Sequence, residues 1–464
     1  MYLIDKFKST ISILFSLILI VAFNACKVTQ PYKEPDNKSM GTLFRDSTLK
    51  DTSNIATIPW RTLFPDKILD SLINEAIHNN LDLQIAVARL KKAEATLRQS
   101  KSAFFPTLSA NANATRKNNG VLGVPEGYEL WGSSSWEVDI WGKLRSTKRA
   151  SFALLLKSEA YKRAVQTQLI ADIADSYYAL LALDAELQVT EKTVELRNSD
   201  VETIKLMKEN DLVTGADLVQ SQANLYSAKV TIPDIKQNIY ETENALSVLI
   251  GKNPGPVARG TLSEQNIYVD LKTGVPAQLV ANRPDVQEAE YQLRFGYEMT
   301  NAARKYFYPS LTLQAAGGLV ASDISKMFNP SSVFWSLLGN LVQPVFNQGI
   351  NRERLKTAIA DQEENVAAYK QVILRSGEEV SDALYGYQAA TEKMKLRTSQ
   401  VEYLEKSVSY TMELLKYTST TNYLDVLTSE VGLLSAQLNS INDKLQQLQS
   451  IVALYRSLGG GWKE

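Results

Sequence analysis

The second half of this chain repeats the first half. The stretch Lys101-Ser102-Ala103-Phe104-Phe105-Pro106 returns as Arg304-Lys305-Tyr306-Phe307-Tyr308-Pro309. Further pairs match in the same order: Asn79 with Asn282, Gly142 with Gly349, Arg145 with Arg352, Asp217 with Asp425, and Gly251 with Gly459. An internal duplication of this length indicates two copies of one structural unit. It favours the wall of a ring, where equivalent halves stand side by side, over an ordinary enzyme.

The N-terminus has the pattern of a secretory signal peptide, predicted over residues 1–25. Lys6 and Lys8 give a positive start, residues 11–23 are mostly apolar, and the small Ala25 precedes Cys26. Cys26 is the only cysteine, so a disulfide within one chain is impossible. We interpret it as a lipoprotein acylation site, which would tether the mature N-terminus to a membrane. The alternative is a thiol with no role.

Residues 26–59 are polar, contain several prolines and show no periodicity, so they are predicted to form an extended tether. The formal net charge of the whole chain is −1, and no basic patch indicates nucleic-acid binding. Beyond the signal, no segment is apolar enough for a transmembrane helix. Any membrane crossing must therefore use strands.

Two very long helical hairpins are predicted. No glycine or proline occurs between Gly142 and Gly215, and the residues there are good helix formers. A helix from Lys143 to Asn210 would be ~100 Å long at ~1.5 Å per residue. The hairpins cover residues 143–250, within a first repeat of 60–251, and residues 350–458, within a second repeat of 282–464. A linker of 252–281 separates the repeats. On helices alone, the chain could be a soluble coiled-coil scaffold.

Four segments with strand character argue against a scaffold. They cover residues 107–116, 133–142, 310–320 and 334–346, and polar and apolar residues alternate most strictly in the first two. A tilted membrane strand needs ~9–11 residues, which these segments supply. The loops between them, 116–132 and 321–333, are polar and are predicted to be external.

Four strands cannot close a barrel, and lipid forbids open strand edges. The chain must therefore share a barrel with copies of itself, as a dimer with eight strands or a trimer with twelve. Eight strands would fill with side chains, so twelve strands fit a pore better. The predicted fold is mainly α with a membrane β-barrel: each repeat supplies a long helical hairpin and two strands, and three chains form a helical tunnel and a 12-stranded barrel.

Several short stretches occur in an order that is typical of one family. They are Trp60-Arg61-Thr62-Leu63-Phe64-Pro65-Asp66, Asn79-Asn80-Leu81-Asp82-Leu83, Arg89-Leu90, Glu243-Asn244-Ala245-Leu246-Ser247-Val248-Leu249-Ile250-Gly251, Arg283-Pro284-Asp285-Val286 and Leu458-Gly459-Gly460-Gly461-Trp462. With them the chain resembles the outer-membrane efflux channels, the TolC-like exit ducts of tripartite pumps, in their lipid-anchored branch. The resemblance implies a homotrimer in the outer membrane with a periplasmic tunnel, an adaptor protein and an inner-membrane transporter. It implies no chemistry in the duct.

The resemblance places a channel constriction just after the turn of the second hairpin. Asp425 falls on one acidic position of the family, and Thr428 falls on the other, so one carboxylate is missing. Leu424 matches an apolar constriction position, and Asp217 is the repeat equivalent of Asp425. The alternative for both aspartates is that they cap the return helices; both roles can coexist. Adaptor docking is expected at the two tips, at Leu212, Val213, Thr214, Gly215, Thr420 and Thr421.

Constellations that carry enzymatic chemistry are absent from the sequence. The single histidine, His78, is predicted on a surface helix, so no metal site is expected. The glycines at 459–461 lack the strand and helix that a phosphate loop needs. We therefore expect no catalytic residue and no cofactor. A non-conducting coiled-coil lipoprotein that spans the periplasm remains the alternative function. Neither the substrate nor the energy source of the partner pump follows from the residues.

Overall fold

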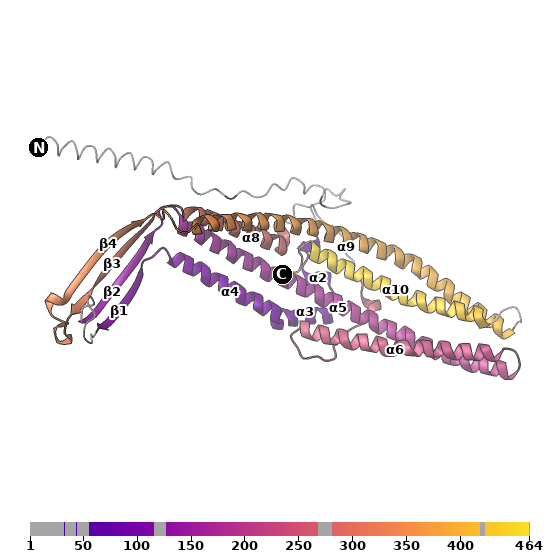
Figure 1. The fold of residues 1–464 in the computed structure, drawn as a ribbon. Coiled ribbons are helices and arrows are strands. Elements are labelled where there is room, and N and C mark those ends of the chain that lie inside the picture. The colour runs from indigo at the N-terminus through magenta and orange to yellow at the C-terminus, as the bar shows by residue number, and fades with distance from the viewer. Residues whose placement is uncertain are drawn as a thin grey trace. The chain divides into compact units, whose positions relative to one another are not determined.

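The computed structural model describes Tyr32, Leu43 and residues 55–115, 127–267, 281–417 and 423–463 (Figure 1). The chain divides into two compact units. The strand unit comprises Met1–Asp36, Arg89–Glu159 and Glu288–Lys370, and the hairpin unit comprises Asn37–Ala88, Ala160–Gln287 and Gln371–Glu464. Within the described residues, no helix combines the length and the apolar character that a membrane span requires.

The strand unit contains one antiparallel sheet with the order β1-β2-β3-β4 (Figure 1). Its strands are β1 (Thr107–Thr115), β2 (Gly127–Val138), β3 (Ser310–Ala321) and β4 (Val333–Val342). In the register, Thr107 pairs with Ser135, Tyr128 with Ala321, and Ser310 with Val342. β1 and β2 form a strand hairpin of the first repeat, and β3 and β4 form one of the second repeat. The two strand hairpins meet at the β2–β3 pair.

Strands β2 and β4 have different bounds from those that the sequence predicts. Residues 127–132 were expected in the loop 116–132, but they belong to β2, because β1 and β3 pair with them on both sides. β2 then ends at Val138, because Asp139 turns away and accepts hydrogen bonds from the backbone N–H groups of Leu144 (2.9 Å) and Arg145 (3.1 Å). The strand predicted to reach residue 346 ends at Val342, two residues before Pro344, which has no N–H for the ladder.

The hairpin unit is built from long helices and a belt of short ones. The long helices are α5 (Lys143–Glu209), α6 (Gly215–Leu249), α9 (Ile350–Tyr417) and α10 (Tyr423–Ser457). The bounds of α5 and α6 lie within one residue of the predicted ones. The guanidinium of Arg197 on α5 donates to the Asn224 carbonyl on α6 (2.8 Å), and that of Arg397 on α9 donates to Asp443 on α10 (3.0 Å).

Short elements pack on the long helices over one continuous apolar core. They are η3 (Ile55–Thr57), α2 (Trp60–Leu63), α3 (Lys67–Asn79) and η4 (Leu262–Glu264). The core includes Trp60, Ile73, Tyr177, Leu246 and Leu454, each at most 2% exposed. Two further helices of equal length, α4 (Leu81–Ser102) and α8 (Pro284–Lys305), precede the strands of the first and second repeat.

Glycines at equivalent repeat positions take the same backbone conformation. Gly251 has a φ of 75° and Gly459 a φ of 86°, in the left-handed region. A Cβ on Gly251 would lie 2.7 Å from the Asn79 carbonyl oxygen, and one on Gly459 would lie 2.5 Å from that of Asn282. The duplication seen in the sequence is therefore a structural one, because each repeat ends its return helix against an asparagine at the equivalent position.

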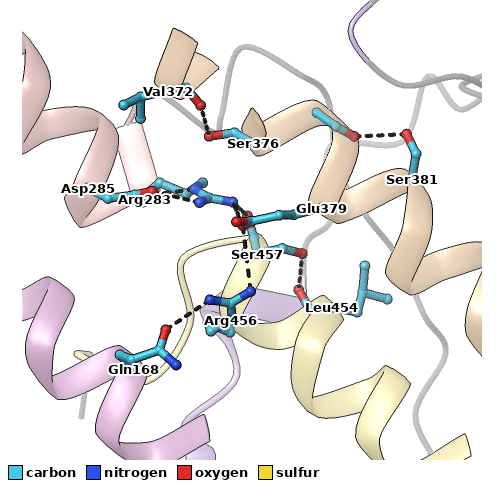
Figure 2. Close-up of polar contacts among 11 residues, drawn as sticks. Gln168, Arg283, Asp285, Val372, Ser376, Glu379, Ser381, Leu454, Arg456 and Ser457 are labelled. Atoms are coloured by element: carbon cyan, nitrogen blue, oxygen red, sulfur yellow. Dashed lines mark hydrogen bonds and ion pairs between the residues drawn. The ribbon is translucent and has the colours of Figure 1, made fainter. Parts of the chain in front are cut away.

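Arg283, at the start of the second repeat, binds the end of α10 and the middle of α9 (Figure 2). Its Nη1 donates to the Ser457 carbonyl oxygen (2.8 Å) and to Glu379 on α9 (2.8 Å), and its Nε and Nη2 donate to the two oxygens of Asp285. The side chain is 7% exposed. The Arg-Pro-Asp stretch of the sequence thus has a structural role: it satisfies a terminal carbonyl of α10 that has no partner within the helix.

Gly459→Ala is expected to lower the free energy of unfolding by about 1–3 kcal/mol, because a Cβ is strained at this φ and collides with the Asn282 backbone. Gly215→Ala is the matched control, since nothing lies within 4 Å of its Cβ position. Thermal unfolding followed by helical circular dichroism should show a lower midpoint for Gly459→Ala only. Equal midpoints for the two variants would contradict this account of the duplication.

Candidate functional site

A small apolar cluster joins the ends of the two helical hairpins. It consists of Ile204 on α5, Leu415 on α9, and Tyr423, Val426 and Leu427 on α10. Val213 and Leu218 of the first hairpin, together with Met207 and Met412, pack against it. We call these residues the tip cluster. The structure therefore brings together the two regions that the sequence analysis singled out, the first tip at 212–215 and the start of α10.

The predicted constriction residues lie on the exposed side of the first turn of α10. Leu424 is 63% exposed, and Asp425 and Thr428 are also exposed, whereas Val426 and Leu427 are buried in the tip cluster. The Thr428 hydroxyl donates to the Leu424 carbonyl oxygen (2.8 Å). One chain thus presents one leucine, one carboxylate and one hydroxyl on a common surface. A ring would need further copies.

Asp217 caps helix α6, as the alternative in the sequence analysis predicted. One of its carboxylate oxygens accepts from the backbone N–H of Thr214 (2.8 Å) and from its hydroxyl (2.7 Å). The hydroxyl of Thr214 in turn accepts from the backbone N–H of Asp217 (3.3 Å), which completes a capping box. A carboxylate held at a helix N-terminus also interacts favourably with the helix dipole.

The first tip is open to solvent. Leu212 is 68% exposed, and Thr214 and Gly215 are also exposed, while Val213 is half-buried against the tip cluster. α5 ends where Asp211 adopts a left-handed conformation with a φ of 57°. Of the other predicted site residues, Thr420 and Thr421 of the second tip and the lipidation candidate Cys26 lie outside the described residues.

The structure reveals a polar cluster that the sequence analysis missed. Asp200 on α5 and Glu430 on α10 share a side-chain hydrogen bond, and Arg197 lies beside them. They line a cavity of about 730 Å³ between α5, α9 and α10. Burial, followed by the negative charge of Asp200, raises the pKa of Glu430 to about 8. Burial also raises the pKa of Asp200. No local pattern marks this contact in the sequence, because it joins the interiors of two long helices.

A second half-buried carboxyl lies in the hairpin unit, further from the tips. Burial, followed by the charge of Asp172, raises the pKa of Asp175 to about 7, while Arg456 acts in the opposite direction. Across the described residues, no group of three or more histidines, cysteines, aspartates or glutamates is placed to hold a metal ion. His78 is exposed on α3, and its Nδ1 lies 2.7 Å from the Asn74 carbonyl oxygen.

The sequence matches a family model described as outer membrane efflux protein over two stretches, residues 72–252 and 275–460. Two curated relatives align along almost their whole length. The toluene efflux pump outer membrane protein TtgF of Pseudomonas putida is 28% identical over 96% of each chain. The cation efflux system protein CusC of Escherichia coli is 27% identical over 97% of this chain and 99% of the relative.

A solved structure has the same fold. The outer-membrane channel OprN superposes with a TM-score of 0.84 at 25% sequence identity, over 94% of this chain and 99% of that chain. The superposition includes the strands as well as the long hairpins, since it covers nearly all of both chains. The mainly helical fold with four antiparallel strands is therefore shared.

Proposed function

This chain belongs to the outer membrane efflux protein family, and we propose that it works as a homotrimeric exit duct anchored to the outer membrane by lipid. It is the outer-membrane channel of an efflux system and not an enzyme. The family match carries the assignment as an efflux channel, because it covers both repeats. The alternative of a non-conducting coiled-coil lipoprotein has no support beyond the helices.

The sheet supports association with further copies. Within the described residues β1 and β4 form its two edges, and an edge exposes unpaired backbone groups. On β4, the alternate residues Val333, Trp335, Leu337 and Leu341 form an apolar face, with 61%, 81%, 75% and 65% exposure. Such a face fits lipid. Pairing β4 of one chain with β1 of the next would satisfy both edges and build a barrel of twelve strands from three chains.

The long helices supply a matching pair of surfaces. On α9 the exposed residues of one stripe recur at intervals of 11 or 7: Leu374, Tyr385, Leu396, Tyr403, Tyr410 and Tyr417. Both intervals return to one helix face. On α6, an exposed stripe contains Val219, Tyr226, Val230 and Tyr240. In the proposed trimer, the α9 stripe of one chain packs on the α6 stripe of the next, which is a heterologous contact that closes a ring.

The purified protein is expected to have the mass of three chains in detergent. Replacing Tyr403 and Tyr410 together by lysine should reduce the trimer, because it places two charges in an apolar interface. The control is Leu206→Lys, which changes an exposed leucine of α5 outside both stripes. Light scattering or native mass spectrometry measures the outcome. A stable wild-type monomer that retains its strands would contradict the proposal.

The proposed efflux system also contains a transporter and an adaptor protein. The efflux pump and efflux system named for the two relatives imply a transporter, which would lie in the inner membrane, and an adaptor protein between it and the duct. The adaptor would dock at the exposed first tip, at 212–215, and at Thr420 and Thr421 of the second hairpin. One relative is named for toluene and the other for cations, so substrate choice in this proposal belongs to the transporter.

Lipid anchoring rests on Cys26 and the apolar run before it. Cys26→Ser is expected to abolish labelling by a radioactive fatty acid and to leave an unprocessed or untethered precursor. The protein should still reach the trimer, because the strands have their own affinity for the membrane. Unchanged labelling and unchanged mobility on a gel would show that Cys26 is not acylated.

The constriction is proposed at the first turn of α10, where Leu424, Asp425 and Thr428 are exposed. In a trimer, three copies of Asp425 would face one another across the pore. Like charges in a confined ring repel each other and attract cations. Asp217 is the repeat equivalent, and its carboxylate is already engaged in the capping box.

Single-channel recordings in planar bilayers test both conduction and the constriction. The wild-type protein should conduct. Asp425→Asn should lower cation selectivity and weaken block by multivalent cations, and the trimer should remain intact. Asp217→Asn is the matched control and should change selectivity less. If selectivity does not change in Asp425→Asn, the constriction lies elsewhere. If the wild-type trimer does not conduct, the exit-duct proposal fails.

A further inference from the structure

We infer that Asp200 and Glu430 form a proton-dependent latch that holds the first helical hairpin to the second, directly behind the tips. The inference rests on the proposed function, because its consequence is the opening of the duct. The two residues belong to different repeats, Asp200 to α5 and Glu430 to α10. A bond between them therefore resists any movement that separates the hairpins.

The geometry of the pair requires a proton. Both side chains are half-buried, and their carboxyl groups contact each other through a hydrogen bond. Two carboxylates accept hydrogen bonds and cannot donate one, so the bond exists only when one of them is protonated. When both lose their protons, the hydrogen bond is replaced by repulsion between two negative charges in a poorly solvated place.

Arg197 does not replace that proton. Its side chain is buried, and its Nη1 donates to the Asn224 carbonyl oxygen on α6 (2.8 Å). Within the described residues, the Nε of Arg197 and the Oε2 of Glu430 are both buried without a hydrogen-bond partner. A fully ionised glutamate held in place by the arginine would not leave these two atoms unpaired. The arrangement fits a carboxyl that is neutral in this state.

The neighbours of the pair come from four helices, and the charged ones lie on α5 and α9. Arg197 and Lys192 come from α5, and α9 supplies Lys416, Glu405 and Glu413 to the same cavity. On α6 the neighbour is the neutral Asn224, and on α10 it is the neutral Tyr423. The positive charges of Arg197 and Lys416 favour ionised carboxyls. Burial, together with the mutual repulsion of Asp200 and Glu430, has the larger effect.

The direction of the pH dependence follows from the raised pKa values. The pKa of Glu430 rises from 4.5 to about 8 in the closed arrangement, and that of Asp200 also rises. A carboxyl with a raised pKa stabilises the closed state fully below its ordinary pKa, and this stabilisation is lost as the pH rises through the raised value. The latch is therefore closed in acid and released toward about pH 8.

The latch lies next to the tip cluster. Glu430 follows Val426 and Leu427 by about one helical turn, and Asp200 precedes Ile204 by about one turn. Among the described residues, the tip cluster is the only cluster of buried apolar residues that joins the ends of the hairpins. It has five buried members. Because few contacts hold the tips together, a change in one adjacent polar bond can shift the equilibrium between joined and separated tips. The large core near the belt of short helices has too many contacts for one bond to have this effect.

The test compares Glu430→Gln with Glu405→Gln in the full-length trimer. A glutamine at 430 keeps a hydrogen-bond donor toward Asp200 and cannot ionise. Glu405 is exposed and lines the same cavity, so its replacement is the matched control. In planar bilayers, the ratio of open to closed wild-type channels should rise with pH between about pH 4.5 and 8, by at most tenfold per pH unit for each proton released on opening. Glu405→Gln should behave in the same way, and Glu430→Gln should change less than twofold.

Infrared spectroscopy of the same trimers in detergent provides a measurement that does not depend on conduction. The absorption of a protonated carboxyl should be present at neutral pH in the wild type and in Glu405→Gln, and reduced in Glu430→Gln. If this band does not differ, or if the pH profile of Glu430→Gln matches the wild type, the latch is overturned while a conducting duct stands. A pair that titrates in a trimer without conductance would instead overturn the exit duct and, with it, the gating role.

Discussion

Unpaired strand edges are the constraint on which the rest of this structure depends. Among the described residues the four-stranded sheet has β1 and β4 as edges, and the apolar face of β4 is largely exposed in the single chain. Backbone groups cannot remain unpaired in lipid, since no water is present to satisfy them. In the proposed trimer, neighbouring chains would pair with both edges of the sheet. They would also cover the exposed stripes on α6 and α9.

The duplication gives each chain two similar units for the proposed ring. Gly251 and Gly459 end their return helices in the same left-handed conformation, each against an asparagine at an equivalent position, and Gly142 and Gly349 have nearly equal φ angles of 77° and 79°. The two repeats thus have the same corners. At the tip of the first hairpin, a capping box at Thr214 and Asp217 begins α6. Similar corners in the two repeats suit the proposed ring.

The sequence predicts the helices well and the strand ends less well, for physical reasons. A stretch without glycine or proline as long as α5 has few alternatives to a helix. The start of β2 depends on pairing with β1 and β3, and no local pattern at 127–132 reveals those partners. In the site, capping by Asp217 could be offered as an alternative, because an acidic residue in the first turn of a helix is a local signal. The contact of Asp200 with Glu430 depends on the rotation of two long helices, which the sequence does not specify.

The distribution of apolar contacts decides which part of the hairpins can move. Near the belt, a large core with Trp60, Tyr177 and Leu454 surrounds the long helices, and Arg283 fixes the end of α10. At the tips, a cluster of five buried residues holds the hairpins together. Burial of apolar area contributes about 25 cal/mol per Å², so the small cluster contributes far less than the belt. Local opening begins where few contacts must break. The inferred latch of Asp200 and Glu430 lies beside the weaker of the two clusters. At that position, the protonation of one polar pair has its greatest effect on the separation of the hairpins.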